Sequence, residues 1–107
     1  GALQDKRLRN AVNAIIANPK ESWSMENLAE SCAMSRANFI RAFKQKTGSL
    51  PGKFLTIMRM NMAGMLLKNT QKPISVIASE VGYQSDTHFS KVFKSYYGIS
   101  PGKYRLI

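Results

Sequence analysis

One stretch of the sequence occurs twice, first over residues 24–54 and again, with substitutions, over 74–104. Both copies carry two phenylalanines one helical turn apart, then a glycine, then Pro-Gly-Lys before an aromatic residue. The matching positions lie 50 residues apart: Phe39, Phe43, Gly48 and 51–54 in the first copy, and Phe89, Phe93, Gly98 and 101–104 in the second. A repeat of this length predicts one supersecondary unit that the chain uses twice.

Each copy has the pattern of a short helix, a tight turn and a second helix with serine at its N-cap. The matching positions are Leu28-Ala29, the turn residue Ala33 and Ser35 in the first copy, and Ile77-Ala78, the turn residue Gly82 and Ser85 in the second. A left-handed backbone is often needed in such a turn. A helix-turn-helix places its second helix in the DNA major groove, so we call the second helix of each copy a recognition helix.

Apolar residues recur at helical spacing along almost the whole chain, and no strand-like alternation occurs. The expected helices are 4–17, a short one after Ser24, one between Ser35 and Gly48, 51–69, one with Pro73 in its first turn, one between Ser85 and Gly98, and a short one after Ser100. The fold class is therefore all-α. Leu50 stands where the second copy has Ser100, so we expect Ser49 to cap the helix at 51–69 instead.

The net charge of +10 favours a polyanionic partner. From residue 32 onward the chain has twelve Lys and Arg but only two acids, Glu80 and Asp86. If the phenylalanines of each recognition helix face inward, the outward face carries small, polar or basic residues: Ala37, Arg41, Lys44 and Gln45 in the first copy, and Thr87, Lys91, Lys94 and Ser95 in the second. One such face could be merely solvated, whereas two matched faces favour contact with phosphates.

The length of the helix at 51–69 suits a chain that places two recognition helices on one DNA duplex. It has 19 residues, or about 28 Å at 1.5 Å per residue. Successive major grooves on one side of B-DNA lie about 34 Å apart. One chain could therefore hold two recognition helices about one DNA turn apart, and we expect a monomer.

Enzymatic, metal and membrane functions have little support in the sequence. The only cysteine, Cys32, and the only histidine, His88, lie in different copies, and no phosphate-binding glycine loop or metal-ligand spacing occurs. We therefore expect no catalytic residue, metal or cofactor. A lone cysteine and the absence of a signal peptide or a long apolar run fit a cytoplasmic location.

The chain resembles the DNA-binding domain of the AraC/XylS family of bacterial transcription regulators, from about residue 5 to 105. The second copy carries the strongest match: Ile77-Ala78, Val81-Gly82-Tyr83, Ser85, His88-Phe89-Ser90, Val92-Phe93-Lys94, Gly98, Ser100-Pro101 and Tyr104-Arg105. The resemblance implies a seven-helix domain, with one helix-turn-helix subdomain at about 5–48, a linker helix at about 51–69 and a second subdomain at about 73–106. It also implies that the two recognition helices enter successive major grooves.

Carried over from the family, the base-contacting positions are Ala37, Ile40, Arg41, Asp86, Thr87, His88, Ser90 and Lys91. Ala37 and Ile40 offer no hydrogen bond, so direct base recognition by the first helix would rest on Arg41, as a guanine donor or alternatively as a phosphate contact. Asp86 could instead assist its helix N-terminus, and His88 could be a packing residue. The phosphate-contact candidates are Arg36, Lys44, Gln45, Lys53, Arg59, Lys94, Lys103 and Arg105. Four of these could instead have structural roles: Lys53, Arg59, Lys103 and Arg105.

The two outward faces differ, which predicts an asymmetric double-stranded DNA target rather than a palindrome. We expect a transcription activator that also contacts RNA polymerase. The alternative function is a basic helical module that binds RNA polymerase or another acidic protein without binding DNA. The family often carries a separate ligand-binding or dimerisation domain, and the sequence leaves open whether one precedes residue 1.

Overall fold

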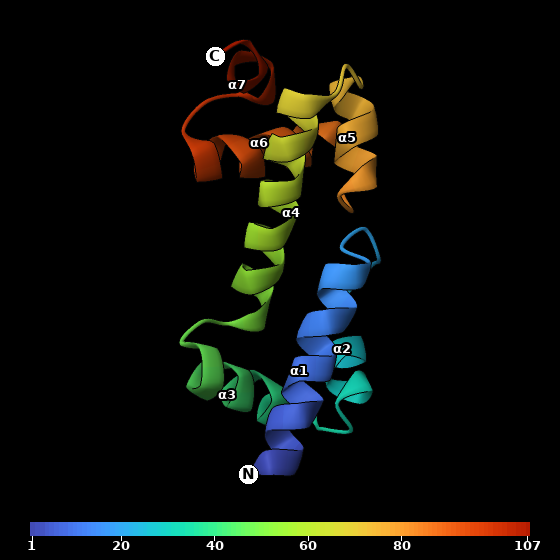
Figure 1. Ribbon diagram of the computed structural model, residues 1–107, viewed down its shortest axis with the longest axis vertical. Helices are drawn as coiled ribbons and strands as arrows, with labels where there is room; N and C mark the ends of the chain where they lie inside the picture. The colour runs from blue at the N-terminus through green and yellow to red at the C-terminus, as the bar shows by residue number, and fades with distance from the viewer. The chain divides into compact units, whose positions relative to one another are not determined.

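The computed structural model describes residues 1–107 and consists of helices without strands (Figure 1). In chain order they are α1 (Ala2–Ala17), α2 (Met25–Ser31), α3 (Arg36–Thr47), α4 (Pro51–Asn69), α5 (Ile74–Glu80), α6 (Asp86–Tyr97) and α7 (Pro101–Leu106). The chain divides into two compact units, Gly1–Thr56 and Ile57–Ile107, called unit 1 and unit 2 below. The boundary falls within α4. The predicted all-α class with seven helices is confirmed.

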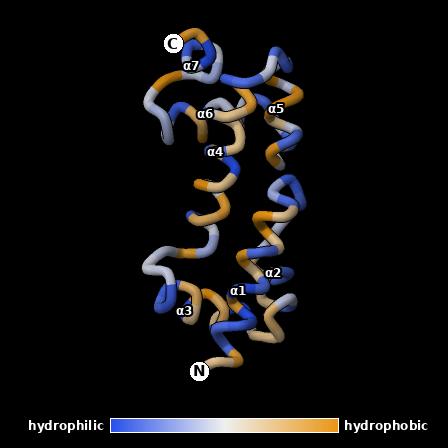
Figure 2. The backbone as a smooth tube through the Cα atoms, in the orientation of Figure 1, coloured by the Kyte–Doolittle hydropathy of each residue, from blue (hydrophilic) through white to orange (hydrophobic).

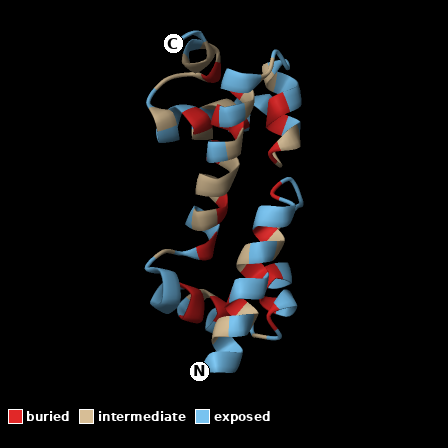
Figure 3. Cartoon of the chain, in the orientation of Figure 1, coloured by how far each residue is buried: buried red, intermediate tan, exposed pale blue.

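Unit 1 is built from α1, α2 and α3, which contact one another pairwise. Each helix buries the apolar residues that recur along one of its faces (Figure 3). The buried side chains are Leu8, Ala11 and Ile15 of α1, Leu28 and Ala29 of α2 with Cys32 after it, and Phe39, Ala42 and Phe43 of α3. The Sγ of Cys32 also donates to the carbonyl oxygen of Arg7 at 3.2 Å, which ties α1 to the turn after α2.

Unit 2 repeats this core with α4, α5 and α6. Its buried residues are Met60, Ala63 and Leu67 of α4, Ile77 and Ala78 of α5 with Val81 after it, and Phe89 and Phe93 of α6. Apolar residues run along most of α4 (Figure 2). Two further aromatic rings, Tyr97 of α6 and Tyr104 of α7, extend the cluster, with centroid distances of 4.4 Å for Phe93–Tyr97 and 5.4 Å for Phe93–Tyr104.

The structural repeat is longer than the repeat in the sequence, because α1 and α4 are also counterparts. The buried triplet Leu8, Ala11 and Ile15 has the same spacing as Met60, Ala63 and Leu67, displaced by 52 residues. The displacement falls to 49 at Cys32 and Val81, because the α1–α2 connection is three residues longer than the α4–α5 connection. Each unit is therefore a three-helix bundle whose second and third helices form the helix-turn-helix.

The turns and caps of the two helix-turn-helix motifs match the prediction. Ala33 and Gly82 both have positive φ, 55° and 100°. The N–H of the residue after each turn donates to the carbonyl oxygen of the alanine in the first helix, at 3.0 Å for Met34 to Ala29 and 2.9 Å for Tyr83 to Ala78. Left-handed glycines follow both recognition helices: Gly48 after α3 and Gly98 after α6.

The starts of α5 and α4 differ in detail from the starts predicted from the sequence. Pro73 lies at the N-cap of α5 and not in its first turn, and its carbonyl accepts from Ile77 N–H at 3.1 Å. The expected Ser49 cap of α4 is wrong, since the Leu50 carbonyl accepts the first helical bond from Phe54 at 3.1 Å. Ser49 lies one residue before the N-cap position, and its N–H donates to Thr47 Oγ1 at 3.1 Å.

Candidate nucleic-acid interface

The outward face of α3 is fixed by its cap and by its buried stripe. Ser35 Oγ accepts from Asn38 N–H at 3.2 Å, which starts the helix so that Phe39 and Phe43 turn inward. The predicted contact residues then lie on the other side: Arg36, Ala37, Arg41, Lys44 and Gln45 are exposed and Ile40 is half-buried.

Arg41 is held by a neighbour that the sequence analysis did not single out. Its Nη1 donates to Asn38 Oδ1 at 3.0 Å, one turn earlier on α3. This contact leaves other guanidinium N–H groups available for a base edge or a phosphate. Arg36 is differently placed, because it forms an exposed ion pair with Glu26 at 3.1 Å. Such a pair contributes little stability and is easily exchanged for a phosphate.

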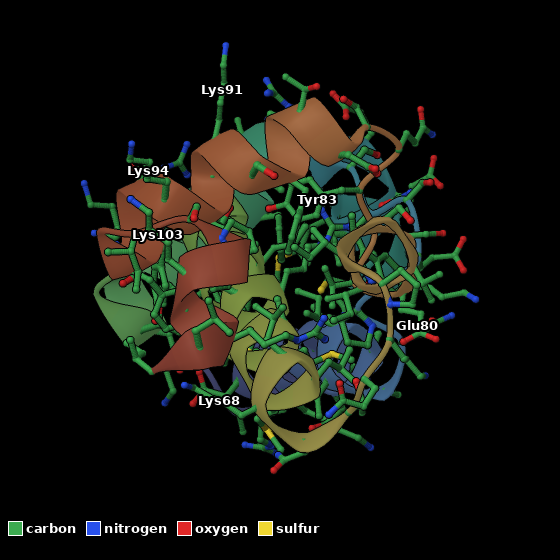
Figure 4. All side chains as sticks on the ribbon, turned by 90° about the horizontal axis from the view of Figure 1, so that it is seen from above. Lys68, Glu80, Tyr83, Lys91, Lys94 and Lys103 are labelled. Atoms are coloured by element: carbon green, nitrogen blue, oxygen red, sulfur yellow. The ribbon has the colours of Figure 1, made fainter.

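The outward face of α6 forms a shallow hollow. Ser85 Oγ accepts from His88 N–H at 3.2 Å, as Ser35 does for α3. The hollow measures about 430 Å³ and brings together most of the second copy's candidates: Asp86, Thr87, Ser90, Lys91 and Lys94, with Ser100 at its edge. Lys91 and Lys94 project outward from α6, while Tyr83 points inward (Figure 4). The hollow offers hydroxyls and two ammonium groups to an anionic ligand.

His88 lies outside that hollow. Its ring packs edge-on against Tyr83 at 5.4 Å between centroids, and Tyr83 packs in the same way against Phe89 at 5.6 Å. Of the two roles considered for His88, the structure favours packing at the flank of the helix. No group of three or more His, Cys, Asp or Glu side chains is placed to hold a metal ion.

Two of the arginines considered as phosphate contacts have structural partners. Arg59 of α4 lies 5.6 Å from the centre of the Tyr83 ring, and burial lowers the pKa of its guanidinium. Arg105 donates Nε–H to the Leu67 carbonyl at 3.1 Å and an Nη2 hydrogen to the Thr70 carbonyl at 3.4 Å. The structural alternative therefore applies to both, since Arg59 supports the turn before α6 and Arg105 binds carbonyls at the end of α4.

The other two, Lys53 and Lys103, are exposed on the first turns of α4 and α7. Neither ammonium group forms an ion pair within the chain. Both remain candidates for phosphate contact, together with Lys44, Gln45 and Lys94.

Comparison with known proteins assigns the family. A family model described as a helix-turn-helix domain matches residues 28–106. A solved structure, the DNA-binding domain of the global transcriptional factor AdpA in complex with a target DNA, superposes with a TM-score of 0.90 at 30% identity, over 94% of this chain and 90% of that one. The solved structure of a transcriptional regulator of the AraC-type DNA-binding domain-containing proteins from Chromobacterium violaceum superposes with a TM-score of 0.84 at 33% identity, over 99% of this chain and 95% of that one. The chain belongs to the AraC family. The two helix-turn-helix motifs therefore serve DNA binding.

Curated relatives are longer HTH-type transcriptional regulators. An uncharacterised HTH-type transcriptional regulator of Haemophilus influenzae is 56% identical over 104 residues, which cover 97% of this chain and 35% of that protein. The RCS-specific HTH-type transcriptional activator RclR of Escherichia coli is 35% identical over 99 residues, which cover 92% of this chain and 35% of that protein. The chain thus spans about a third of the length of these relatives. None of its helices is long and apolar enough to cross a membrane.

Gly82 in the turn of the second motif of this AraC-type domain allows a direct test of how α4 supports α6. Its φ is +100°, and a Cβ built there would lie 2.9 Å from Arg59 Nε. We expect Gly82→Ala to lower the free energy of unfolding of unit 2 by about 2 kcal/mol, because a left-handed backbone is costly for alanine and the guanidinium must move. Urea denaturation followed by circular dichroism measures the change.

The control for this variant is Ala33→Gly at the matching turn of unit 1, where φ is 55°. Glycine accepts this backbone conformation, so the control is expected to change stability by less than about 1 kcal/mol. A Gly82→Ala protein as stable as the wild type would show that the turn and Arg59 adjust without cost.

Proposed function

We propose that the chain binds double-stranded DNA sequence-specifically as a monomer, with α3 and α6 in successive major grooves. The observation that carries this proposal is the matched pair of helix-turn-helix motifs, each capped by serine, closed by a left-handed turn and exposing a basic helix face. The 19 residues of α4 correspond to about 28 Å of helix, close to the groove repeat of about 34 Å. Such a chain would cover about two turns of DNA.

The base-contacting roles follow from what each exposed side chain can donate or accept. Arg41 suits a bidentate contact to guanine O6 and N7, and Lys91 suits guanine or a phosphate. Thr87 and Ser90 bring hydroxyls that serve either bases or phosphates. Ala37 and Ile40 suit contact with thymine methyl groups.

Phosphate contacts come from the exposed basic and amide groups around these helices. They are Arg36, Lys44, Gln45, Lys53, Lys94 and Lys103. Asp86 sits in the first turn of α6, where a carboxylate stabilises the positive end of the helix dipole. Because the two outward faces differ, the DNA site is asymmetric.

At the level of the whole protein, we propose a bacterial transcription activator that contacts RNA polymerase and works in the cytoplasm on chromosomal DNA. RclR, a relative over 92% of the chain, is named as an activator. Since the chain spans only about a third of its curated relatives, effector binding and dimerisation would belong to the rest of such a protein.

The alternative, a basic module that binds RNA polymerase or another acidic protein without DNA, is less well supported. Two matched recognition helices serve no purpose in a protein that only presents positive charge. The two functions differ in sequence dependence, because a basic surface attracts any polyanion while base contacts discriminate.

The test is binding of the 107-residue chain to duplexes selected from a random library. Fluorescence anisotropy would compare the selected duplex with a shuffled duplex of the same composition from about 50 to about 200 mM salt, because phosphate contacts alone weaken equally on both. We expect tighter binding to the selected duplex at every salt concentration and a 1:1 complex by analytical ultracentrifugation. Equal affinity for both duplexes would leave the protein-interaction alternative.

A further inference from the structure

A hollow on unit 1 lies beside the recognition helix α3 and is also walled by α1. It measures about 790 Å³ and is lined by the start of α1, the turn after α2 and one side of α3. The polar side chains around it are Gln4, Arg7, Ser35, Asn38, Arg41 and Gln45. Helix α1, which the sequence analysis assigned no DNA contact, therefore presents side chains next to Arg41.

The charges around this hollow favour an anion. Arg7 and Arg41 reach it from different helices, and no acidic residue lines it. The nearest acid in sequence, Asp5, is paired with Lys46 at 3.1 Å. Two guanidinium groups that face one space repel each other, and an anion between them removes that repulsion. Arg7 forms no ion pair within the chain.

The backbone of Arg7 is fixed although its guanidinium group is unpaired. Its carbonyl oxygen accepts the hydrogen bond from the buried Cys32, and the next residue, Leu8, is part of the core. A side chain carried by such an anchored turn has less backbone freedom to lose on binding than one on a loop.

The counterpart of Arg7 in unit 2 shows what this position does when it has a structural role. Arg59 precedes Met60 as Arg7 precedes Leu8, 52 residues apart. Arg59 packs on the Tyr83 ring and beside Gly82. In unit 1, Met34 takes the place of Tyr83 after the turn, and no ring is available to Arg7. The same position is used for packing in unit 2 and opens onto the hollow in unit 1.

We propose that Arg7 binds a backbone phosphate of the DNA, in the hollow beside the base pair that Arg41 contacts. The proposal rests on the DNA-binding function proposed above and adds α1 to the interface. A guanidinium group suits this role because it donates two parallel hydrogen bonds to a phosphodiester. The hollow also suits a free phosphate-bearing molecule, which the experiment must distinguish.

The test uses Arg7→Gln, which removes the charge and keeps a residue with good helix propensity. We expect about tenfold weaker binding to every duplex at about 100 mM salt, because one charge-assisted contact is lost. The slope of log K against log salt should become shallower by about 0.9, the value for one phosphate. Arg7→Lys should recover most of the affinity, since an ammonium group still pairs with a phosphate as a point charge.

The matched control is Arg9→Gln, which removes the same charge from an exposed position on α1 outside the hollow. We expect it to weaken binding by less than about twofold. Equal losses for the two variants, or no change of the salt slope in Arg7→Gln, would overturn the proposal. A change of preference at one base pair would overturn it too, by making Arg7 a base contact. Thermal denaturation would confirm that both variants fold.

Inorganic phosphate, titrated against the wild type and Arg7→Gln by NMR, distinguishes the two sources of the anion. Phosphate binding that is lost in Arg7→Gln, together with unchanged DNA affinity, would assign the hollow to a free ligand and overturn the proposal. The proposed function fails separately: a wild-type chain that binds selected and shuffled duplexes equally refutes both. A wild type that discriminates, with an unaffected Arg7→Gln variant, refutes only the role of Arg7.

Discussion

Replacing Phe93 by alanine is expected to lower the free energy of unfolding of unit 2 by about 4 kcal/mol. Phe93 is fully buried and lies at the centre of an aromatic cluster, with Phe89, Tyr97 and Tyr104 at centroid distances of 5.8, 4.4 and 5.4 Å. Tyr97 is itself held by a hydrogen bond from its hydroxyl to the Met60 carbonyl at 2.9 Å. This hydrogen bond limits how far the Tyr97 ring can move into the space left by Phe93. A loss of this size approaches the whole stability of so small a unit.

The matched control is Phe43→Ala, which removes the corresponding fully buried ring from unit 1. The core cluster of unit 2 contains no residue from unit 1. Amide hydrogen exchange should therefore show lost protection in α5 and α6 for Phe93→Ala, and in α2 and α3 for Phe43→Ala. Equal loss of protection in both units for either variant would mean that they unfold as one cooperative body, contrary to this expectation.

Local signals explain why most of the fold could be predicted from the sequence. The serine caps and left-handed glycines act within four residues of the helix end they define, so their pattern is visible in a short window. Ser35, Ser85, Gly48 and Gly98 all lie where the pattern places them. Ser49 misled because serine is the better N-cap residue, whereas the helix starts one residue later, where the Leu50 carbonyl accepts from Phe54 N–H at 3.1 Å.

The kinship of α1 and α4 was missed for a different reason. Two connections of unequal length change the displacement of the repeat from 52 to 49 and then to 50. The two helices also share little beyond a buried triplet. Most residues of α1 are exposed to solvent, whereas α4 carries apolar residues along much of its length. Alignment at one constant displacement cannot detect such a pair. The burial pattern reveals it, and with it the correspondence of Arg7 and Arg59.

The residues of the candidate site likewise fall into those whose roles the sequence could assign and those whose roles it could not. Positions on α3 and α6 could be assigned because burial of the phenylalanines fixes the outward face. The roles of Arg59 and Arg105 could not, because their partners are carbonyls or rings far away in sequence, such as Leu67 for Arg105 at 3.1 Å. A positive side chain in a basic protein looks the same in the sequence whether it binds a phosphate or a helix end.

Arg41→Ala is expected to relax base preference at one position of the DNA site. The guanidinium of Arg41 is exposed and is oriented by Asn38 at 3.0 Å, while Ala37 and Ile40 on the same face have no hydrogen-bonding group. We therefore expect direct recognition by α3 to depend mainly on this one side chain. Loss of a bidentate contact to guanine costs about 1–3 kcal/mol, or about fivefold to about 160-fold in discrimination. Affinities for duplexes with each base pair substituted in turn measure this effect.

Lys103→Ala provides the contrast, because Lys103 is exposed on α7 and is proposed to contact a phosphate. We expect it to weaken binding to all duplexes by a similar factor and to make the salt slope shallower by about 0.9. Arg41→Lys separates geometry from charge, since lysine keeps the charge but cannot form the two parallel hydrogen bonds. A base contact predicts that Arg41→Lys also relaxes the preference. Uniform weakening by Arg41→Ala, with recovery in Arg41→Lys, would make Arg41 a phosphate contact and leave α3 to recognise its groove through shape and methyl groups.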